Sequence, residues 1–296
     1  MAQIGVGKLT LEYERFGPTD RETVVLIMGL GAQMTRWPVA LCQLIVDRGF
    51  HVVRFDNRDI GLSTKLDWLG APDIGALIAA RSAGQGAVPP YRLDDMAADT
   101  VGLLDALGID KAHIVGASMG GMIAQLLAAD FPDRTRSLTS IMSTTANPAV
   151  PQGTPEALMA LMAPPAPAGD EAAIVARSLR IAKIIGSPGY PQEDAILRDM
   201  ILADARRSFH PVGAARQMAA VVCAEDRRPK LAALAVPTVV LHGADDPLVP
   251  VEGGQDTAAT IPGAELRIVP GMGHDLPPAL LGTIADAIAS AAGRAG

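Results

Sequence analysis

The sequence predicts an α/β protein whose central sheet is mostly parallel and is flanked by helices. Short apolar segments alternate with segments of helix length along most of the chain, which is typical of successive β-α-β units. Glycine or proline stands at several of the boundaries, where these residues end helices and begin turns. Hydrophobic residues make up 49% of the 296 residues and charged residues 19%, so the chain can bury a large core.

The expected elements follow one another in a regular order. Residues 8–13 alternate in character, and residues 23–28 form a β-branched, apolar run. A helix over residues 93–107 starts with two aspartates, which suit the positive end of a helix dipole, and ends at Gly108. Strands are expected at residues 8–13, 23–28, 51–55, 112–115, 137–143, 236–242 and 265–269, and helices at 38–49, 93–107, 119–131 and 278–292.

The composition and the hydrophobic pattern of the sequence change between residues 144 and 228. Strand patterns disappear there, and clusters of proline and glycine separate stretches rich in alanine, leucine and methionine. We therefore expect a helical cap inserted at residues 144–228, with residues 1–143 and 229–296 forming one α/β core. A second stretch, residues 69–90, is rich in glycine and proline and is longer than an ordinary connection. Long loops of this kind are usually functional or mobile.

A motif of the form G-x-S-x-G spans residues 116–120, between an expected strand and an expected helix. Side chains at the two glycines would collide with neighbouring backbone when serine occupies a sharp strand-to-helix turn. Such a turn lifts a hydroxyl out of the sheet and places it at a helix N-terminus, where N–H groups face developing negative charge. We therefore predict that Ser118 is a nucleophile.

A serine nucleophile needs a histidine that takes its proton and a carboxylate that orients the histidine. His274 follows the expected strand 265–269 and so lies at the carboxyl edge of the sheet, where sites gather in open α/β folds. His210 falls inside the helical insertion, and His242 ends a strand, which favours a packing role. His51 and His113 begin strands at the opposite edge, so we expect them to be structural.

The carboxylate is expected in the turn at residues 243–250, which also follows a strand. Asp245 and Asp246 compete for this role, and Pro247 fixes a turn directly after the second of them. Backbone N–H donors are also needed for the oxyanion, and the motif predicts one at Met119 and one in the loop after residues 23–28. Leu30 lies in that loop between two glycines.

Five blocks in this order resemble the α/β-hydrolase superfamily over nearly the whole chain. They are residues 28–31, 56–63, 116–121, 242–250 and 271–274. A Met-Gly entry to the oxyanion loop, a Ser-Met-Gly elbow and a Pro-Gly-Met-Gly-His ending resemble the aclacinomycin methylesterase-like group. The resemblance implies an inserted helical cap, a triad of Ser118, Asp246 and His274, and oxyanion donors at Leu30 and Met119. Many superfamily members carry histidine where this chain has Met28.

The leading hypothesis is a serine carboxylic ester hydrolase that forms an acyl-enzyme with a small-to-medium apolar ester, such as a methyl ester or lactone, without metal or cofactor. A cofactor-free perhydrolase or a C–C bond hydrolase would use the same triad. The alternative from a different class is a receptor-like protein that binds a ligand on this fold. Adaptable thioethers suit a roomy apolar pocket but pack cores equally well. The expected pocket residues are Met34, Met159, Met162 and Leu248.

Charge and composition exclude other classes of protein. The net charge is −7, and the only adjacent arginines are two isolated pairs, so no basic stripe for nucleic acid is present. No apolar run reaches the length of a membrane span, and no signal peptide is evident. Cys42 and Cys223 lie far apart in apolar surroundings, which favours buried thiols in a reducing cytoplasm. The expected partner is a small ester substrate, and the oligomeric state stays open.

Overall fold

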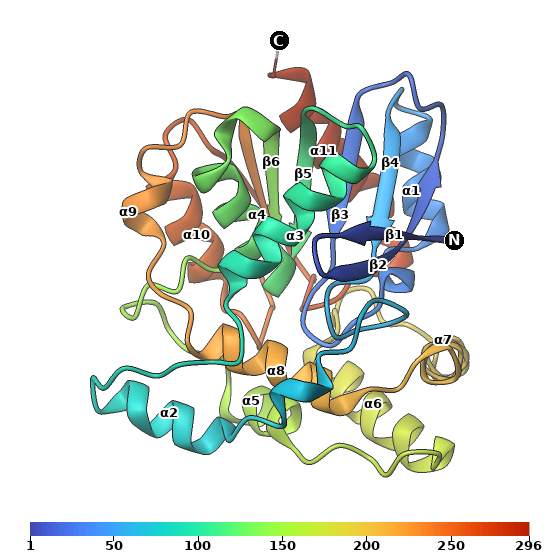
Figure 1. The fold of residues 1–296 in the computed structure, drawn as a ribbon, viewed down its shortest axis with the longest axis vertical. Helices are drawn as coiled ribbons and strands as arrows, with labels where there is room; N and C mark the ends of the chain where they lie inside the picture. Colours follow the sequence, from blue (N-terminus) through green and yellow to red (C-terminus); the bar gives the residue numbers. More distant parts are fainter. Residues whose placement is uncertain (296) are drawn as a thin grey trace.

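An eight-stranded sheet forms the centre of the computed structural model, which describes residues 1–295 (Figure 1). The strand order is β1-β2-β4-β3-β5-β6-β7-β8. The pairs β1·β2 and β2·β4 are antiparallel, and all the others are parallel. The strands are β1 (Ala2–Val6), β2 (Leu9–Phe16), β3 (Thr23–Ile27), β4 (His51–Phe55), β5 (Ala112–Ala117), β6 (Thr135–Ile141), β7 (Thr238–Gly243) and β8 (Glu265–Val269).

Strand β3 is buried on both faces, as a strand in the middle of the protein must be. All five of its residues are buried, as expected for a parallel strand that is covered on both faces. Val25 and Ile27 join the core cluster on one face, while Val24 and Leu26 join the cluster on the other. The two-residue period of a strand therefore divides one apolar run between two cores.

Helices cover both faces of this sheet (Figure 1). Helices α3 and α4 pack on one face, and α1 and α11 pack on the other. The helices of the α/β part are α1 (Val39–Val46), α3 (Leu93–Ala106), α4 (Met119–Asp130), α9 (Arg228–Leu231), α10 (Val251–Thr260) and α11 (Leu281–Gly293). Short 3-10 turns occur at η1 (Met34–Arg36), η2 (Asp67–Leu69), η3 (Pro132–Arg134) and η4 (Pro278–Leu280).

Residues 144–228 contain helices and no strand. The helices are α5 (Pro155–Met162), α6 (Glu171–Ile185), α7 (Asp194–Arg207) and α8 (Pro211–Val222), and α9 begins at the last of these residues. Figure 1 shows α5 to α8 together below the sheet, beside the carboxyl ends of the parallel strands. We call residues 144–222 the cap. A fully buried ion pair joins α8 to the core, because Arg216 Nη2 lies 2.7 Å from Asp59 Oδ1.

The expected strands are all present, with ends shifted by no more than three residues. Several elements of the core were not expected, among them β1 and α10. Strand β1 lies at the antiparallel edge of the sheet, where its side chains are largely exposed and give little apolar pattern. Helix α10 carries Gly253 and Gly254, which are poor helix formers. Gly254 is required there because a Cβ atom would lie 2.5 Å from His242 Nδ1.

The stretch at residues 69–90 is not wholly irregular, because it contains helix α2 (Ile74–Ser82). Asp73 caps this helix by accepting a 2.9 Å hydrogen bond from the N–H of Ala76. Helix α2 packs against α8 of the cap. Helix α2 has only nine residues, and the glycines and prolines that flank it gave the sequence the pattern of a loop.

Both cysteines are free and buried. Burial raises the pKa of the Cys42 thiol to about 11, so this group is an inert, protonated thiol at neutral pH. Among residues 1–295, every helix is too short or too polar to cross a bilayer.

Candidate active site

Ser118 stands on the sharp turn between β5 and α4. Its backbone has φ 56° and ψ −123°, a conformation that few residues other than glycine adopt. The surrounding glycines make the turn possible. A Cβ atom at Gly116 would lie 2.0 Å from Gly120 O, and one at Gly120 would lie 2.0 Å from Ile27 O. The sequence therefore needs glycine on both sides of the serine for steric reasons.

His274 meets this serine from a loop that follows β8. Its Nε2 atom lies 2.9 Å from Ser118 Oγ, and its Nδ1 atom lies 2.7 Å from Asp246 Oδ2. The histidine side chain is only 7% exposed, and the aspartate side chain is fully buried. Three residues that are far apart in the sequence are thus joined in one hydrogen-bonded chain.

Asp246 is held as an acceptor. Its Oδ1 atom receives hydrogen bonds from the N–H groups of Leu248 (2.9 Å) and Val249 (2.8 Å). A carboxylate that accepts on both oxygens is best satisfied when ionised, so Nδ1 of His274 carries a proton and donates it. That tautomer leaves Nε2 of His274 as the acceptor for the hydroxyl proton of Ser118.

Asp245 makes a different contact in the same turn. Its Oδ2 atom accepts a 2.7 Å hydrogen bond from the N–H of Gly271, in the loop that carries His274. The two candidate carboxylates are therefore separated by the structure. Asp246 contacts the imidazole, whereas Asp245 contacts only the backbone of the histidine loop.

The loop that follows β3, residues 28–33, lies directly beside the serine, and we call it the oxyanion loop after the role predicted for Leu30. A Cβ atom at Gly29 would lie 3.1 Å from Ser118 Cβ and 3.6 Å from Ser118 Oγ. In residues 1–295, no hydrogen bond within the chain uses the N–H of Leu30 or of Met119. Both donors are therefore free for an oxygen atom of a ligand.

Comparisons with known proteins identify the family of this fold. The sequence profile of the alpha/beta hydrolase fold family matches residues 22–173, just over half of the chain. The chain belongs to the alpha/beta hydrolase fold family. It is an enzyme of the hydrolase class, and its eight-stranded, mostly parallel sheet flanked by helices is the fold expected from the sequence.

Two relatives and one solved structure resemble this hydrolase along most of its length. The chain is 27% identical over 299 residues to a rhodomycin D methylesterase of Streptomyces sp. (strain C5), covering 95% of this chain and 94% of that protein. It is 27% identical over 252 residues to 3-oxoadipate enol-lactonase 2 of Acinetobacter baylyi, covering 83% and 80%. The enol-lactonase structure from Burkholderia xenovorans LB400 has a TM-score of 0.66, 22% identity and 99% coverage of both chains. The resemblance to the methylesterase group is thus confirmed.

The remaining histidines of the hydrolase lie apart from the serine or are packed. His242 is fully buried, and its Nε2 atom donates to Val249 O at 2.8 Å, beside Asp246. Desolvation lowers its pKa, so this imidazole stays neutral. His51 and His113 bond Thr23 Oγ1 and Ser137 Oγ within the sheet, and His210 contacts Asp67 and Arg216.

The polar turn at residues 56–63 braces the oxyanion loop. Asp56 is fully buried and accepts a 2.7 Å hydrogen bond from the N–H of Met34. Its other oxygen accepts from Leu62 N–H at 2.9 Å and pairs with Arg207 of the cap at 2.7 Å. Asn57 donates to Met28 O at 2.9 Å. This turn therefore joins the loop, the core and the cap, which agrees with a structural role.

The four expected pocket residues occupy different surroundings. Met34 is fully buried in η1, and Leu248 is partly buried beside Asp246. Met159 and Met162 lie on α5, and they are 67% and 49% exposed. The helix period therefore turns both cap methionines at least partly toward solvent in this structure, and α5 buries Ala157 and Ala160 instead.

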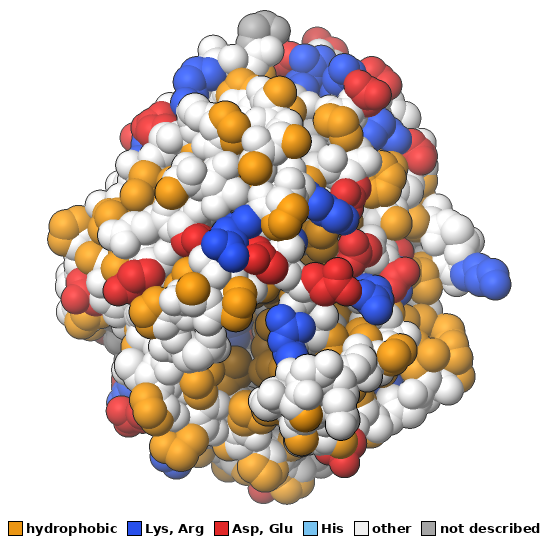
Figure 2. Space-filling model, turned by 90° about the vertical axis from the view of Figure 1, so that its left-hand side faces the viewer, with side chains coloured by type: hydrophobic (Ala, Val, Ile, Leu, Met, Phe, Trp, Pro, Cys, Tyr) orange, Lys and Arg blue, Asp and Glu red, His pale blue; other side chains and the backbone are white. Residues whose placement is uncertain are grey.

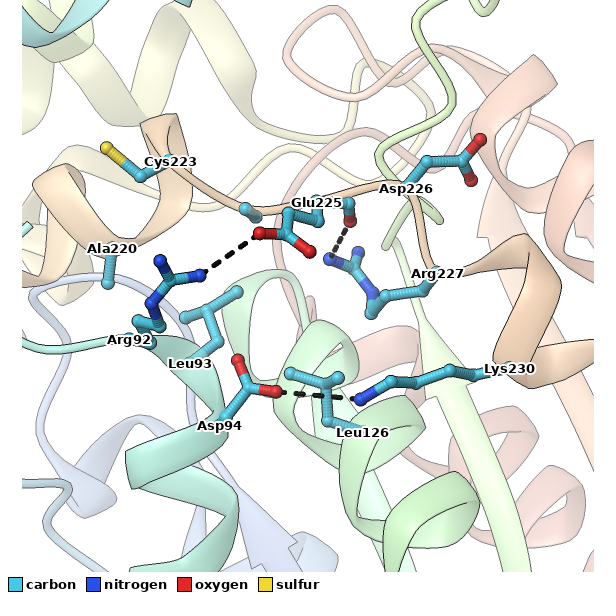
Figure 3. A pocket seen from close by; sticks show the side chains of 11 residues that line it. Arg92, Leu93, Asp94, Leu126, Ala220, Cys223, Glu225, Asp226, Arg227 and Lys230 are labelled. Carbon is cyan, nitrogen blue, oxygen red and sulfur yellow. Dashed lines mark hydrogen bonds and ion pairs between the residues drawn. The ribbon is translucent and has the colours of Figure 1, made fainter. Parts of the chain in front are cut away.

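A separate pocket of about 120 Å³ lies between the core and the end of α8. Figure 3 shows that charged side chains line it and that Arg92 and Lys230 point toward Glu225 and Asp94. On the face shown in Figure 2, Lys and Arg side chains likewise alternate with Asp and Glu across the middle. None of the residues that line this pocket is Ser118, His274 or Asp246.

Sequence reasoning missed several polar residues that support the site. Gln217 of α8 is fully buried, and its Oε1 atom accepts a 2.8 Å hydrogen bond from Gly31 N–H, next to Leu30. Ser187 and Asp275 meet beside His274. Asp275 is the immediate neighbour of the predicted base, a signal that was available in the sequence. Gln217 and Ser187 lie in the insertion, where no pattern distinguishes them.

Proposed function

We propose that this protein is a serine carboxylic ester hydrolase that works through an acyl-enzyme. The observation that carries the proposal is the hydrogen-bonded chain from Ser118 Oγ through the His274 imidazole to Asp246. Relatives named as a methylesterase and an enol-lactonase support hydrolysis of ester bonds in general. Ser118 is the nucleophile, His274 the general base and Asp246 the carboxylate that orients the imidazole.

The reaction has two steps in this proposal. Ser118 Oγ attacks the ester carbonyl carbon while His274 Nε2 takes the hydroxyl proton, and the carbonyl oxygen becomes an oxyanion. The N–H groups of Leu30 and Met119 donate to that oxyanion. His274 then gives its proton to the leaving alcohol oxygen, and the acyl group remains on Ser118. Water attacks the acyl-enzyme by the same sequence of proton transfers and releases the acid.

The substrate class we propose is a small-to-medium apolar ester, including methyl esters and lactones. The cap lies beside the carboxyl end of the sheet (Figure 1), so it supplies the walls that exclude water and select the ester. A panel of esters in which the acyl and alcohol parts are varied separately would identify which side of the ester is recognised.

The test of the mechanism is Ser118→Ala together with labelling by a fluorophosphonate probe. We expect esterase activity to fall by about 10⁵- to 10⁶-fold, because the members of a triad act as a unit. The variant should keep the circular dichroism spectrum of the parent, and the probe should label the parent only. Ser178→Ala in α6 is the matched control, since its hydroxyl makes no contact described for the site.

Near-normal activity of Ser118→Ala would contradict the mechanism. A parent protein that hydrolyses no ester and resists the probe would instead support a receptor-like role. Labelled Ser118 without ester turnover would direct the search to perhydrolysis or C–C bond cleavage.

A further inference from the structure

The segment after α6, residues 185–192, lies against the loop that carries His274, residues 270–275. The backbone N–H of His274 donates to Ile185 O at 2.6 Å. The N–H of Gly189 donates to Gly271 O at 2.9 Å. The catalytic histidine loop is therefore bonded to the cap through the backbone of the histidine itself.

Glycines allow the two backbones to approach this closely. A Cβ atom at Gly273 would lie 2.4 Å from Gly186 O, and one at Gly189 would lie 2.8 Å from Gly271 Cα. No other side chain fits at Gly273 or Gly189 unless backbone moves. The contact is thus a packed joint between backbones with no space for a side chain between them.

Ser187 forms the polar centre of this joint. Ser187 is 4% exposed, and its hydroxyl accepts a 2.9 Å hydrogen bond from Gly273 N–H. The same hydroxyl bonds Asp275 Oδ1, and Gln192 Nε2 donates to Asp275 Oδ2 at 3.2 Å. Two residues of the cap therefore hold the carboxylate that follows His274 in the chain.

The direction of these bonds indicates the charge of Asp275. A backbone N–H can only donate, so Ser187 accepts from Gly273 and its single proton is directed to Asp275. Burial raises the pKa of Asp275, while the hydrogen bonds from Ser187 and Gln192 act in the opposite direction. Asp275 accepts on both oxygens, as an ionised carboxylate does. A negative charge beside His274 favours the imidazolium that forms during catalysis.

We propose that Ser187 and Asp275 are positioning residues for His274, and that residues 185–192 of the cap are a fixed part of the active site. The proposal rests on the function proposed above. Ser187 sets the backbone of the histidine loop, and Asp275 adds a second carboxylate whose charge acts on the imidazole. The cap is therefore bonded to the histidine loop at this end.

Ser187→Ala tests the positional part. We expect kcat to fall about 10-fold, with KM within about two-fold, because a displaced general base slows chemistry more than binding. Hydrogen exchange at the Gly273 and His274 amides should accelerate. Ser178→Ala, in the preceding helix α6, should leave the kinetic constants and the exchange of these amides unchanged.

Asp275→Asn tests the electrostatic part, since the amide can still accept from Ser187. Loss of a negative charge lowers the pKa of a nearby imidazole. The acidic limb of the pH profile of kcat/KM, which reports the free enzyme, should therefore move to lower pH. Asp199→Asn on the exposed side of α7 is the control and should leave the limb in place.

The outcomes separate the two proposals. Unchanged kcat and unchanged amide exchange in Ser187→Ala, with an unmoved acidic limb in Asp275→Asn, would overturn the positioning role. The fluorophosphonate probe would still label Ser118 in that case, and the proposed mechanism would stand. Faster amide exchange in Ser187→Ala is expected even if the mechanism proves wrong, because it reports the joint alone.

Discussion

Two parts of the cap differ in their contact with the catalytic loops. Residues 185–222 bond the histidine loop through Ser187 and the oxyanion loop through Gln217. Helix α5 makes no side-chain hydrogen bond to either loop among the described residues, and it exposes Met159. The first part is bonded to the loops of the proposed site, whereas α5 makes no such bond. Substitutions in the two parts should therefore change different kinetic properties.

The largest loss of activity is expected from a change in the proposed triad. We expect Asp246→Asn to lower kcat/KM by about 10⁴-fold, because an amide favours the wrong tautomer of the histidine. Asp245→Asn should cost only about 10-fold, since that carboxylate reaches His274 through Gly271 alone. Steady-state kinetics on one activated ester measures both. A larger loss for Asp245→Asn would reverse the assignment of the two aspartates.

Gln217→Leu should show what the built-in part of the cap contributes. The change removes the acceptor of Gly31 N–H and lets the turn that carries Leu30 move. We expect kcat to fall between about 10- and 100-fold, with a smaller change in KM, because the oxyanion exists only after attack.

The exposed Gln152, also in the cap, gives the matched control. Gln152→Leu should leave kcat unchanged. Equal losses in Gln152→Leu and Gln217→Leu would mean that cap stability, and not the oxyanion loop, controls the rate.

Met159→Ala and Met162→Ala should have the smallest effect and change preference only. We expect the ratio of kcat/KM between a bulky and a small ester to shift by a few-fold, about the value of one or two methylene contacts. Labelling of Ser118 by a small organophosphate should stay the same. If bulky and small esters respond in equal proportion, α5 does not select the substrate.

The sequence was sufficient for the parts of this protein that depend on local sterics. The elbow at Ser118 needs glycine at fixed positions, and β8 was predicted with its observed ends because it is bounded by turn residues. The choice between Asp245 and Asp246 depended on a resemblance. Adjacent residues in one turn share every local property, and only the contact with His274 separates them.

The supporting residues could not be predicted for a related reason. Gln217 and Ser187 act through tertiary contacts with loops that are 186 and 86 residues away in the chain. Neither has a neighbour in sequence that marks it. Met159 and Met162 show the complementary difficulty, because in an alanine-rich helix the small residues Ala157 and Ala160 face inward and the larger methionines do not.

The backbone of Ser118 carries one more consequence. Its φ of 56° costs a residue with a Cβ atom about 1–3 kcal/mol, and glycine would occupy the position without that cost. Selection for thermal resistance alone would therefore favour glycine at position 118, which would remove the hydroxyl group. A serine at this position therefore lowers stability in exchange for a hydroxyl, and a chain of this fold without the proposed reaction would be more stable with glycine there.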